Sequence, residues 1–167
     1  MTRVLTTEKF AVETTPVRTH DGGTVNKHVV VHPGAVALVP VLDDGRVVLI
    51  RNERFAVGRT LLEVPAGTLS PGEPPIECAA RELREETGYV ARLLEPLATF
   101  YTAPGFCTEA MHIFVATKLE HVGQALEPTE HIEPVPVIRE ELERMIDSGA
   151  IEDAKTLAAL MLWMRRG

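Results

Sequence analysis

The chain has 167 residues, of which 45% are hydrophobic and 25% charged. This is the size and composition of one globular domain with a sizeable core. A formal net charge of −7 argues against a broad basic surface, so we expect no nucleic-acid partner. No apolar run approaches the roughly 18 residues of a membrane span, and the N-terminus lacks a signal peptide's apolar stretch. The spacing of Cys78 and Cys107 indicates neither a disulfide framework nor a zinc site, so we expect a cytoplasmic protein without a membrane partner.

The first 33 residues alternate polar and β-branched side chains. Residues 10–19 and 24–31 flank Asp21-Gly22-Gly23, which predicts a β-hairpin. Such a hairpin is marginal alone and needs a surface to pack on. The break at Pro33-Gly34 divides this strand pair, residues 1–33, from a main domain of residues 34–167.

The segment after Gly34 is strongly apolar. Residues 35–42 and 46–55, joined by a turn at 43–45, predict a second hairpin, and Pro40 indicates an edge or a bulge. We expect further strands at 61–64, 91–101, 109–119 and 135–138, and helices at 140–147 and 153–164. Strands combined with these helices predict an α+β fold.

The most informative stretch runs from Gly67 to Tyr89. Prolines 74 and 75 suit a first helical turn, and Gly88 suits a helix end. Apolar recurrence at helical spacing predicts the buried face of this helix, made by Ile76, Ala80, Leu83 and Thr87.

The same helix carries a cluster of carboxylates. Glu82 and Glu86 lie one turn apart beside the predicted apolar face, so we expect them to point into a cleft. Glu85 lies within reach of Arg81. Carboxylates gathered on one helix repel one another unless a cation neutralises them, and Mg²⁺ prefers oxygen ligands of this kind. A solvated acidic face is the simpler alternative.

The order Gly, five residues, Glu, seven residues, Arg-Glu-aliphatic-any-Glu-Glu-any-Gly is the Nudix box. Eight residues match it: Gly67, Glu73, Arg81, Glu82, Leu83, Glu85, Glu86 and Gly88. The chain therefore resembles the Nudix hydrolases, with Tyr89 where an aliphatic residue is usual. The resemblance implies the Nudix fold, a mixed sheet sandwiched between helices. It also implies cleavage of a nucleoside diphosphate derivative with two to three Mg²⁺ or Mn²⁺ ions.

Two further stretches narrow this resemblance. Residues 62–67, Leu-Glu-Val-Pro-Ala-Gly, resemble the corresponding segment of ADP-ribose pyrophosphatases. Residues 102–106 do so too, and their Pro104 lies 15 residues beyond the box. A plain β-turn at Pro104-Gly105 is the alternative. The resemblance implies substrate contacts at Arg54, Ala103, Pro104, Gly105 and Glu109. The aromatic residue usual before the arginine is Glu53 here, and His32 is implied as a contact from a partner subunit.

The resemblance also implies a set of metal ligands. These are the carbonyl of Ala66 and the carboxylates of Glu82 and Glu86, with Glu85 and Glu130 as further candidates. Glu73 and Arg81 are implied to hold the box loop to its helix by an ion pair, and pairing of Glu85 with Arg81 alone stays open.

A hydrolase needs a group that takes a proton from water. In ADP-ribose pyrophosphatases a glutamate on a distant mobile loop has this role. Residues 120–133 correspond to that loop and offer Glu127, Glu130 and Glu133, of which Glu130 fits best; Glu85 is a further catalytic candidate.

The resemblance thus implies metal-dependent hydrolysis of ADP-ribose to AMP and ribose 5-phosphate by a homodimer whose N-terminal strands pack on the partner. Alternatives are another nucleoside diphosphate derivative (GDP-mannose, FAD or NADH) or a non-catalytic nucleotide-sensing module.

Overall fold

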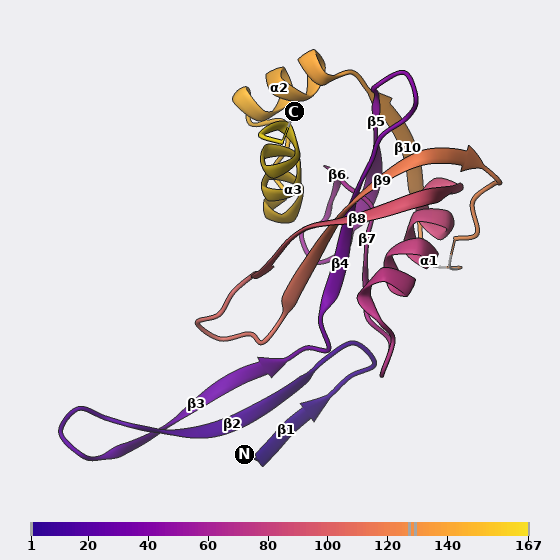
Figure 1. Cartoon of the computed structure of the whole chain (residues 1–167). Coiled ribbons are helices and arrows are strands. Elements are labelled where there is room, and N and C mark those ends of the chain that lie inside the picture. Colours follow the sequence, from indigo (N-terminus) through magenta and orange to yellow (C-terminus); the bar gives the residue numbers. More distant parts are fainter. Residues whose placement is uncertain (1, 127, 129, 167) are drawn as a thin grey trace.

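The computed structural model describes residues 2–126, 128 and 130–166. Within them the strands form three sheets (Figure 1). The first sheet has the order β1-β2-β3, the second β10-β5-β6 and the third β7-β4-β9-β8. The elements are β1 (Thr2–Thr6), β2 (Ala11–Arg18), β3 (Thr24–Val31), β4 (Ala35–Pro40), β5 (Val47–Arg54), β6 (Arg59–Glu63), β7 (Ala66–Thr68), α1 (Pro75–Thr87), β8 (Tyr89–Tyr101), β9 (Ala110–His121), β10 (Ile132–Val137), α2 (Arg139–Asp147) and α3 (Ala154–Met164).

The four-stranded sheet lies between α1 on one face and α3 on the other (Figure 1). Side chains of a strand point alternately to its two faces, and β4 is buried on both. Val36 and Leu38 pack with Leu83 of α1, whereas Ala37 and Val39 pack in the core that includes α3. The predicted α+β fold with a mixed sheet between helices is therefore confirmed.

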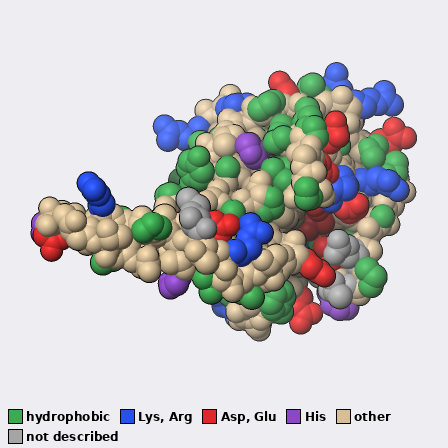
Figure 2. All heavy atoms as spheres, turned by 90° about the horizontal axis from the view of Figure 1, so that it is seen from below, with side chains coloured by type: hydrophobic (Ala, Val, Ile, Leu, Met, Phe, Trp, Pro, Cys, Tyr) green, Lys and Arg blue, Asp and Glu red, His purple; other side chains and the backbone are tan. Residues whose placement is uncertain are grey.

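The N-terminal strands extend away from this body (Figure 1, Figure 2). The predicted hairpin is confirmed, because β2 pairs with β3 in antiparallel register from Ala11↔Val31 to Arg18↔Thr24. The structure adds β1, which the sequence pattern did not predict and which pairs with β2. We call residues 2–31 the arm.

The predicted second hairpin is wrong. β4 and β5 are adjacent in the chain, but β4 lies between β7 and β9, and β5 lies between β10 and β6. Only a single bridge, Val41↔Val47, joins the two segments. Pro40 is neither at an edge strand nor at a bulge. It is the last residue of central strand β4, beyond residues 35–37 that pair with β7. Val41 N–H, after the proline, still donates to the Ala116 carbonyl of β9, so the missing N–H interrupts neither pairing.

The remaining predicted elements are found with shifted ends. The strand expected at 135–138 begins at Ile132, and that expected at 91–101 begins at Tyr89. Among the described residues, no helix has both the length and the apolar character needed to cross a membrane.

Candidate active site

The box glycine faces the box carboxylates. Gly67 belongs to β7, which pairs with β4 and packs under α1. A Cβ on Gly67 would lie 1.8 Å from Cδ of Glu82, so only the absence of a side chain leaves room for that carboxylate. The neighbouring N–H of Ala66 donates to Oε2 of Glu86 at 2.8 Å. The Pro-Ala-Gly bend therefore contacts both glutamates, Glu82 by close packing and Glu86 by a hydrogen bond.

The carbonyl of Ala66 points toward the same side. Leu38 N–H donates to the Pro65 carbonyl, so the Pro65 carbonyl faces β4. Consecutive residues of a strand direct their backbone groups to opposite sides. The N–H and C=O of Ala66 therefore both face away from β4, and the bond to Glu86 lies in that direction.

The buried face of α1 differs from the one predicted. Leu83 and Thr87 are buried as expected, but Ile76 and Ala80 are exposed. The buried positions are Cys78, Ala79, Glu82, Leu83, Glu86 and Thr87. The helix is rotated relative to the apolar pattern, because Glu82 fills the space that the absent side chain of Gly67 leaves and Glu86 accepts the Ala66 N–H. Hydrophobic periodicity does not predict the burial of acidic side chains.

The predicted ion pair between the box loop and α1 is confirmed. Arg81 donates from Nε to Glu73 Oε1 at 3.0 Å and from Nη2 to Glu73 Oε2 at 3.1 Å. These bonds lower the pKa of Glu73 to about 2. Nη1 of the same arginine donates to Glu82 and to Glu85 Oε2, at 2.6 and 3.0 Å. Arg81 thus joins the loop to the acidic row on the helix.

The two inner glutamates are held in an environment that disfavours their charge. Burial raises the pKa of Glu86 to about 8, and the charges of Glu82 and Glu130 act in the same direction. Burial likewise raises the pKa of Glu82, although Arg81 opposes the shift. Buried carboxylates that repel one another gain most from a nearby cation.

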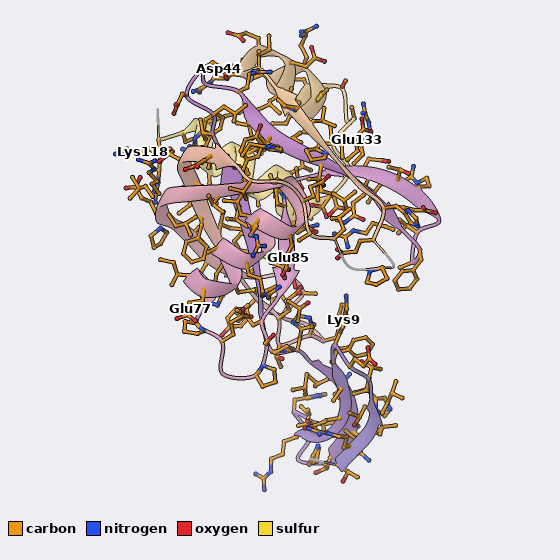
Figure 3. All side chains as sticks on the ribbon, turned by 90° about the vertical axis from the view of Figure 1, so that its right-hand side faces the viewer. Lys9, Asp44, Glu77, Glu85, Lys118 and Glu133 are labelled. Atoms are coloured by element: carbon orange, nitrogen blue, oxygen red, sulfur yellow. The ribbon has the colours of Figure 1, made fainter. Side chains whose placement is uncertain are left out.

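The three predicted loop glutamates differ in position. Glu130 is close enough to Glu82 and Glu86 to raise the pKa of both. Glu133 lies on β10, is exposed, and pairs with Arg51 at 3.3 Å; Figure 3 shows it apart from Glu85 of α1. Glu127 lies outside the described residues.

Arg54 lies at the end of β5 and is paired with an acid of the next strand. Its Nε and Nη2 donate to Oε1 and Oε2 of Glu63 at 2.8 and 2.6 Å. Nη1 has no hydrogen-bond partner among the described residues, and the side chain is 39% exposed. The charge of Arg54 lowers the pKa of Glu86, and the charge of Glu86 raises that of Arg54. Arg54 therefore borders the acidic cluster and has one nitrogen available to a ligand.

Glu63 is a residue whose importance the sequence reasoning missed. It is fully buried and carries a second ion pair, to Lys155 at the start of α3. Burial opposes its ionisation, but the bonds from Arg54 and the charge of Lys155 keep its pKa below the ordinary value. Asp153 contacts Lys155 at 3.0 Å and caps α3 through Thr156 N–H. The similarity of residues 62–67 to ADP-ribose pyrophosphatases was the available signal for Glu63.

The predicted substrate residues after Tyr101 form the loop between β8 and β9. Residues 102–109 are called the substrate loop below. A turn closes it, with Phe106 N–H donating to the Ala103 carbonyl at 3.1 Å across Pro104-Gly105. Glu109 Oε2 accepts from the Thr102 hydroxyl at 2.6 Å. A turn is therefore present at Pro104-Gly105, as the alternative interpretation expects, and the residues implied to contact the substrate lie in and beside it, so their substrate role stays a prediction.

The box loop, residues 69–74 between β7 and α1, and the substrate loop lie at the same end of the four-stranded sheet. Ala35 pairs with Thr68 on one side and with Met111 on the other. The carbonyl of Gly34, just before β4, accepts a hydrogen bond from Leu69 N–H. A Cβ added at Gly34 would lie 3.4 Å from the Ala110 carbonyl oxygen. The structure thus brings together two loops that are about 35 residues apart in the sequence.

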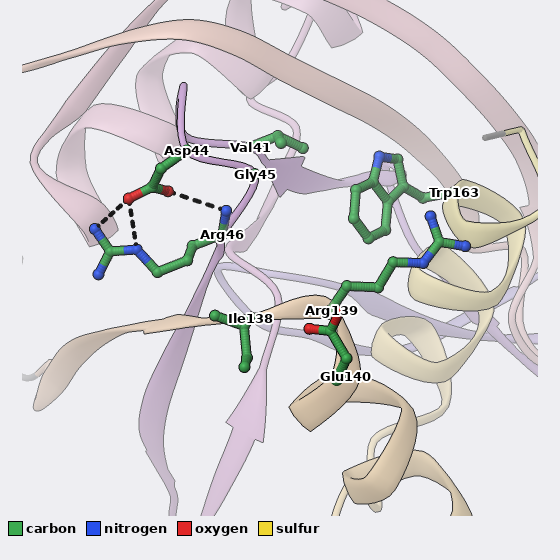
Figure 4. Close-up of a pocket in the computed structure, with 8 residues that line it drawn as sticks. All are labelled: Val41, Asp44, Gly45, Arg46, Ile138, Arg139, Glu140 and Trp163. Carbon is green, nitrogen blue, oxygen red and sulfur yellow. Dashed lines mark hydrogen bonds and ion pairs between the residues drawn. The ribbon is translucent and has the colours of Figure 1, made fainter.

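Two pockets lie away from this cluster, on the side of α2 and α3. The larger, of about 380 Å³, is lined by residues that include Arg46, Arg139 and Trp163 (Figure 4). Arg139 covers the Trp163 ring at 5.6 Å, and Arg46 is engaged by Asp44. Neither pocket is lined by a box residue, so the expected cleft at Glu82 and Glu86 does not coincide with either.

The donor set at the box fits a divalent cation of the magnesium type. Within the described residues, no three acidic, histidine or cysteine side chains converge closely enough to ligate one ion. Mg²⁺, however, is usually held by one or two carboxylates, with water and substrate phosphates completing its shell. Glu82, Glu86 and the Ala66 carbonyl match that arrangement, and a cation there would offset the burial and the repulsion that raise both glutamate pKa values.

Comparisons with known proteins agree with this geometry. The NUDIX domain family matches residues 31–160. The ADP-ribose pyrophosphatase of Bacillus subtilis (strain 168) is 39% identical over 142 residues, covering 84% of this chain and 77% of the relative. That of Mycobacterium tuberculosis is 45% identical over 116 residues, covering 69% and 56%. A crystal structure of an ADP compounds hydrolase superposes with a TM-score of 0.85 at 26% identity, covering 98% of this chain and 89% of the other. The Nudix family generally requires a divalent metal, and these matches show that the chain belongs to this family and is a Nudix hydrolase.

Proposed function

We propose that this hydrolase cleaves the pyrophosphate bond of ADP-ribose and releases AMP and ribose 5-phosphate. The observation that carries the proposal is the pair Glu82 and Glu86, buried against the Ala66-Gly67 bend with raised pKa values. Such a pair suits binding of cations that in turn bind a diphosphate. The similarity to ADP-ribose pyrophosphatases and the substrate loop with Pro104 support ADP-ribose as the substrate.

Ala66, Glu82 and Glu86 would hold two to three Mg²⁺ or Mn²⁺ ions, with Glu85 and Glu130 as further ligands. Divalent ions supply charge neutralisation for the diphosphate and acidify water. The roles of the chain's own residues then follow from their places.

Glu130 accepts a proton from the attacking water, because it is the loop glutamate in electrostatic range of the acidic pair. The water oxygen attacks one phosphorus in line, and the bond from that phosphorus to the bridging oxygen breaks. Arg54, oriented by Glu63, offers Nη1 to the substrate, while Glu109 and residues 103–105 contact it from the substrate loop. The rate acceleration comes from positioning of the water and the substrate and from neutralisation of the diphosphate charge, without a covalent intermediate.

The arm supports a proposal about assembly. Several of its large apolar side chains are exposed, at 38–61% of their surface: Val4, Leu5, Phe10, Val17 and Val25. Exposed apolar clusters of this kind mark protein interfaces. We propose that residues 1–33 are a dimerisation extension of a Nudix domain at 34–167, and that the protein is a homodimer. Cys78 and Cys107 are both free thiols, which agrees with a cytoplasmic location.

The test is product analysis with Mg²⁺ on ADP-ribose, GDP-mannose, FAD and NADH, for the unmodified protein, Glu82→Gln and Glu77→Gln. Glu77 is an exposed acid of the same helix and serves as the matched control. We expect AMP from ADP-ribose, a loss of kcat of about 10³-fold in Glu82→Gln, and no loss in Glu77→Gln. Mn²⁺ titration of each variant measures ion binding separately. Faster cleavage of another compound would refute ADP-ribose as the preferred substrate. A Glu82→Gln protein that keeps its activity would refute the assignment of Glu82 as a metal ligand.

A further inference from the structure

The arm and the substrate loop are joined by hydrogen bonds within one chain. At the end of β3, Val30 N–H donates to the Phe106 carbonyl at 2.8 Å, and Thr108 N–H donates to the Val30 carbonyl at 2.9 Å. This is a short parallel bridge, centred on Val30↔Cys107. The loop that carries Pro104 is therefore attached to the N-terminal sheet as well as to its own strands.

One side chain extends this junction. The Thr108 hydroxyl accepts from His32 N–H at 2.9 Å and donates to the His32 carbonyl at 3.3 Å. Both backbone groups of His32 are thus satisfied by one hydroxyl, 76 residues away in the chain. A valine in place of the threonine has nearly the same shape and makes neither bond.

The junction continues to Glu109 and to the box loop. Nδ1 of His32 accepts from Gly34 N–H at 3.1 Å and lies 3.5 Å from Glu109 Oε1. The two interactions are alternatives, because Nδ1 cannot accept a proton from Gly34 and donate one to Glu109 at once. Gly34 itself has a φ of +107° and receives the Leu69 N–H bond. The residues from His32 to Gly34 therefore contact both loops at the end of the sheet.

We infer that Thr108 is a positioning residue: its hydroxyl ties the substrate loop to His32, the residue that follows the arm, and so sets the affinity for the substrate and not the rate of bond cleavage. The inference rests on the proposed function, because it takes residues 102–109 as the loop that binds the substrate. Among the described residues, no hydrogen bond or ion pair joins Glu82 or Glu86 to Thr108 or His32, so the chemical step is expected to be insensitive to this bond. The arm then contributes to substrate binding through its own chain, in addition to any role in assembly.

The experiment compares Thr108→Val, Thr108→Ser and Thr24→Val in the full-length protein. Thr24 begins β3 at the end remote from the substrate loop and is the matched control. KM and kcat are measured on ADP-ribose with saturating Mg²⁺. Loss of two partly exposed hydrogen bonds predicts that KM rises about threefold to tenfold in Thr108→Val. We expect kcat to stay within about twofold, since transition-state contacts are unchanged, and Thr108→Ser and Thr24→Val to resemble the unmodified protein.

Hydrogen–deuterium exchange without substrate supplies a readout that does not depend on activity. Amides of residues 102–109 should exchange faster in Thr108→Val, while those of β4 should not change. An unchanged exchange rate in the loop, an unchanged KM, a fall in kcat of the same size as the rise in KM, or failure of serine to restore KM would each overturn the inference. Absence of ADP-ribose cleavage by the unmodified protein would instead refute the proposed function. KM is then measured on whichever compound is cleaved, and the exchange result still decides whether Thr108 holds the loop.

Discussion

Substituting alanine for Gly67 would place a methyl group where a carboxylate now lies. The added Cβ would be 1.8 Å from Cδ and 1.9 Å from Oε1 of Glu82, whereas non-bonded heavy atoms approach to about 3.5 Å. The carboxylate must therefore move by roughly 1.5 Å or more. The backbone needs no rearrangement, because Gly67 does not have a positive φ, and the atoms in the way end a flexible side chain.

The cost to stability should be small. A strained Glu82 rotamer costs about 0.5–1.5 kcal/mol, and loss of its bond to Arg81, which keeps Glu73 and Glu85 as partners, adds at most about 1 kcal/mol. The lower entropy of an unfolded chain with alanine returns about 0.4–1 kcal/mol. The net change is roughly 1–2 kcal/mol at most, or a Tm decrease of no more than about 8 °C for a chain of this size.

The cost to activity should be large. A displacement of about 1 Å in a reacting constellation lowers a rate by roughly 10²-fold, and the displaced group here is a proposed metal ligand. We expect kcat on ADP-ribose to fall at least about 10²-fold, and Mn²⁺ affinity to fall with it.

Calorimetric unfolding, Mn²⁺ titration and the AMP assay on Gly67→Ala test these three expectations. The control is Gly23→Ala in the turn of the arm, where the new Cβ meets the Thr19 hydroxyl at 2.9 Å. A Gly67→Ala protein that binds Mn²⁺ normally and keeps its rate would show that the carboxylate does not act from this position. A protein that fails to fold would show that more than one side chain depends on the space over Gly67.

Two further predictions concern pH and assembly. Burial raises the pKa of Glu86 from 4.5 to about 8, so the metal-free native state keeps a proton that the unfolded chain releases, and this group costs stability progressively as pH rises from about 4.5 to about 8. Because Mg²⁺ binds the ionised form, the rise in Tm on adding Mg²⁺ should be small at pH 5 and larger at pH 8. The pH dependence should be weaker in Glu86→Gln, where Glu82 is the remaining buried acid with a raised pKa; a pH-independent rise in the unmodified protein would contradict this. Light scattering should give twice the 18.3 kDa of one chain, with Val25→Lys shifting the mass toward a monomer, and a monomeric unmodified protein would refute the homodimer.

Local signals sufficed for the box and its helix. Pro75 at the start and Gly88 at the end act within a few residues of themselves, and α1 begins and ends where they indicate. The pair of Glu73 and Arg81 also spans a short loop, and the ion pair that the family resemblance implied for it is present in the structure. The family resemblance, which rests on the same short motif, agrees with the matches to known Nudix proteins.

The partners of distant segments needed the tertiary structure. Strands β4 and β5 are close in sequence, and the turn between them resembles a hairpin, yet β4 pairs with β7 and the distant β9, whereas β5 pairs with β6 and the distant β10. The link of Glu63 to Lys155 spans 92 residues, and that of His32 to Thr108 spans 76. Nothing in the local sequence encodes such pairs, because their energy depends on distances that exist only after the sheets have formed.

The sequence by itself determined which side chains are available at the candidate site: a glycine, a row of glutamates and an arginine at set intervals. Which of those glutamates are buried, and hence which would most need a cation, was decided by the tertiary structure. Helical periodicity assigned the inner face of α1 to apolar residues, but pairing of β7 with β4 places the bare backbone of Gly67 beneath the helix. The carboxylate of Glu82 occupies the space that Gly67 leaves open, and that of Glu86 accepts a hydrogen bond from the Ala66 N–H beside it, so both acids are buried against backbone and not against apolar side chains.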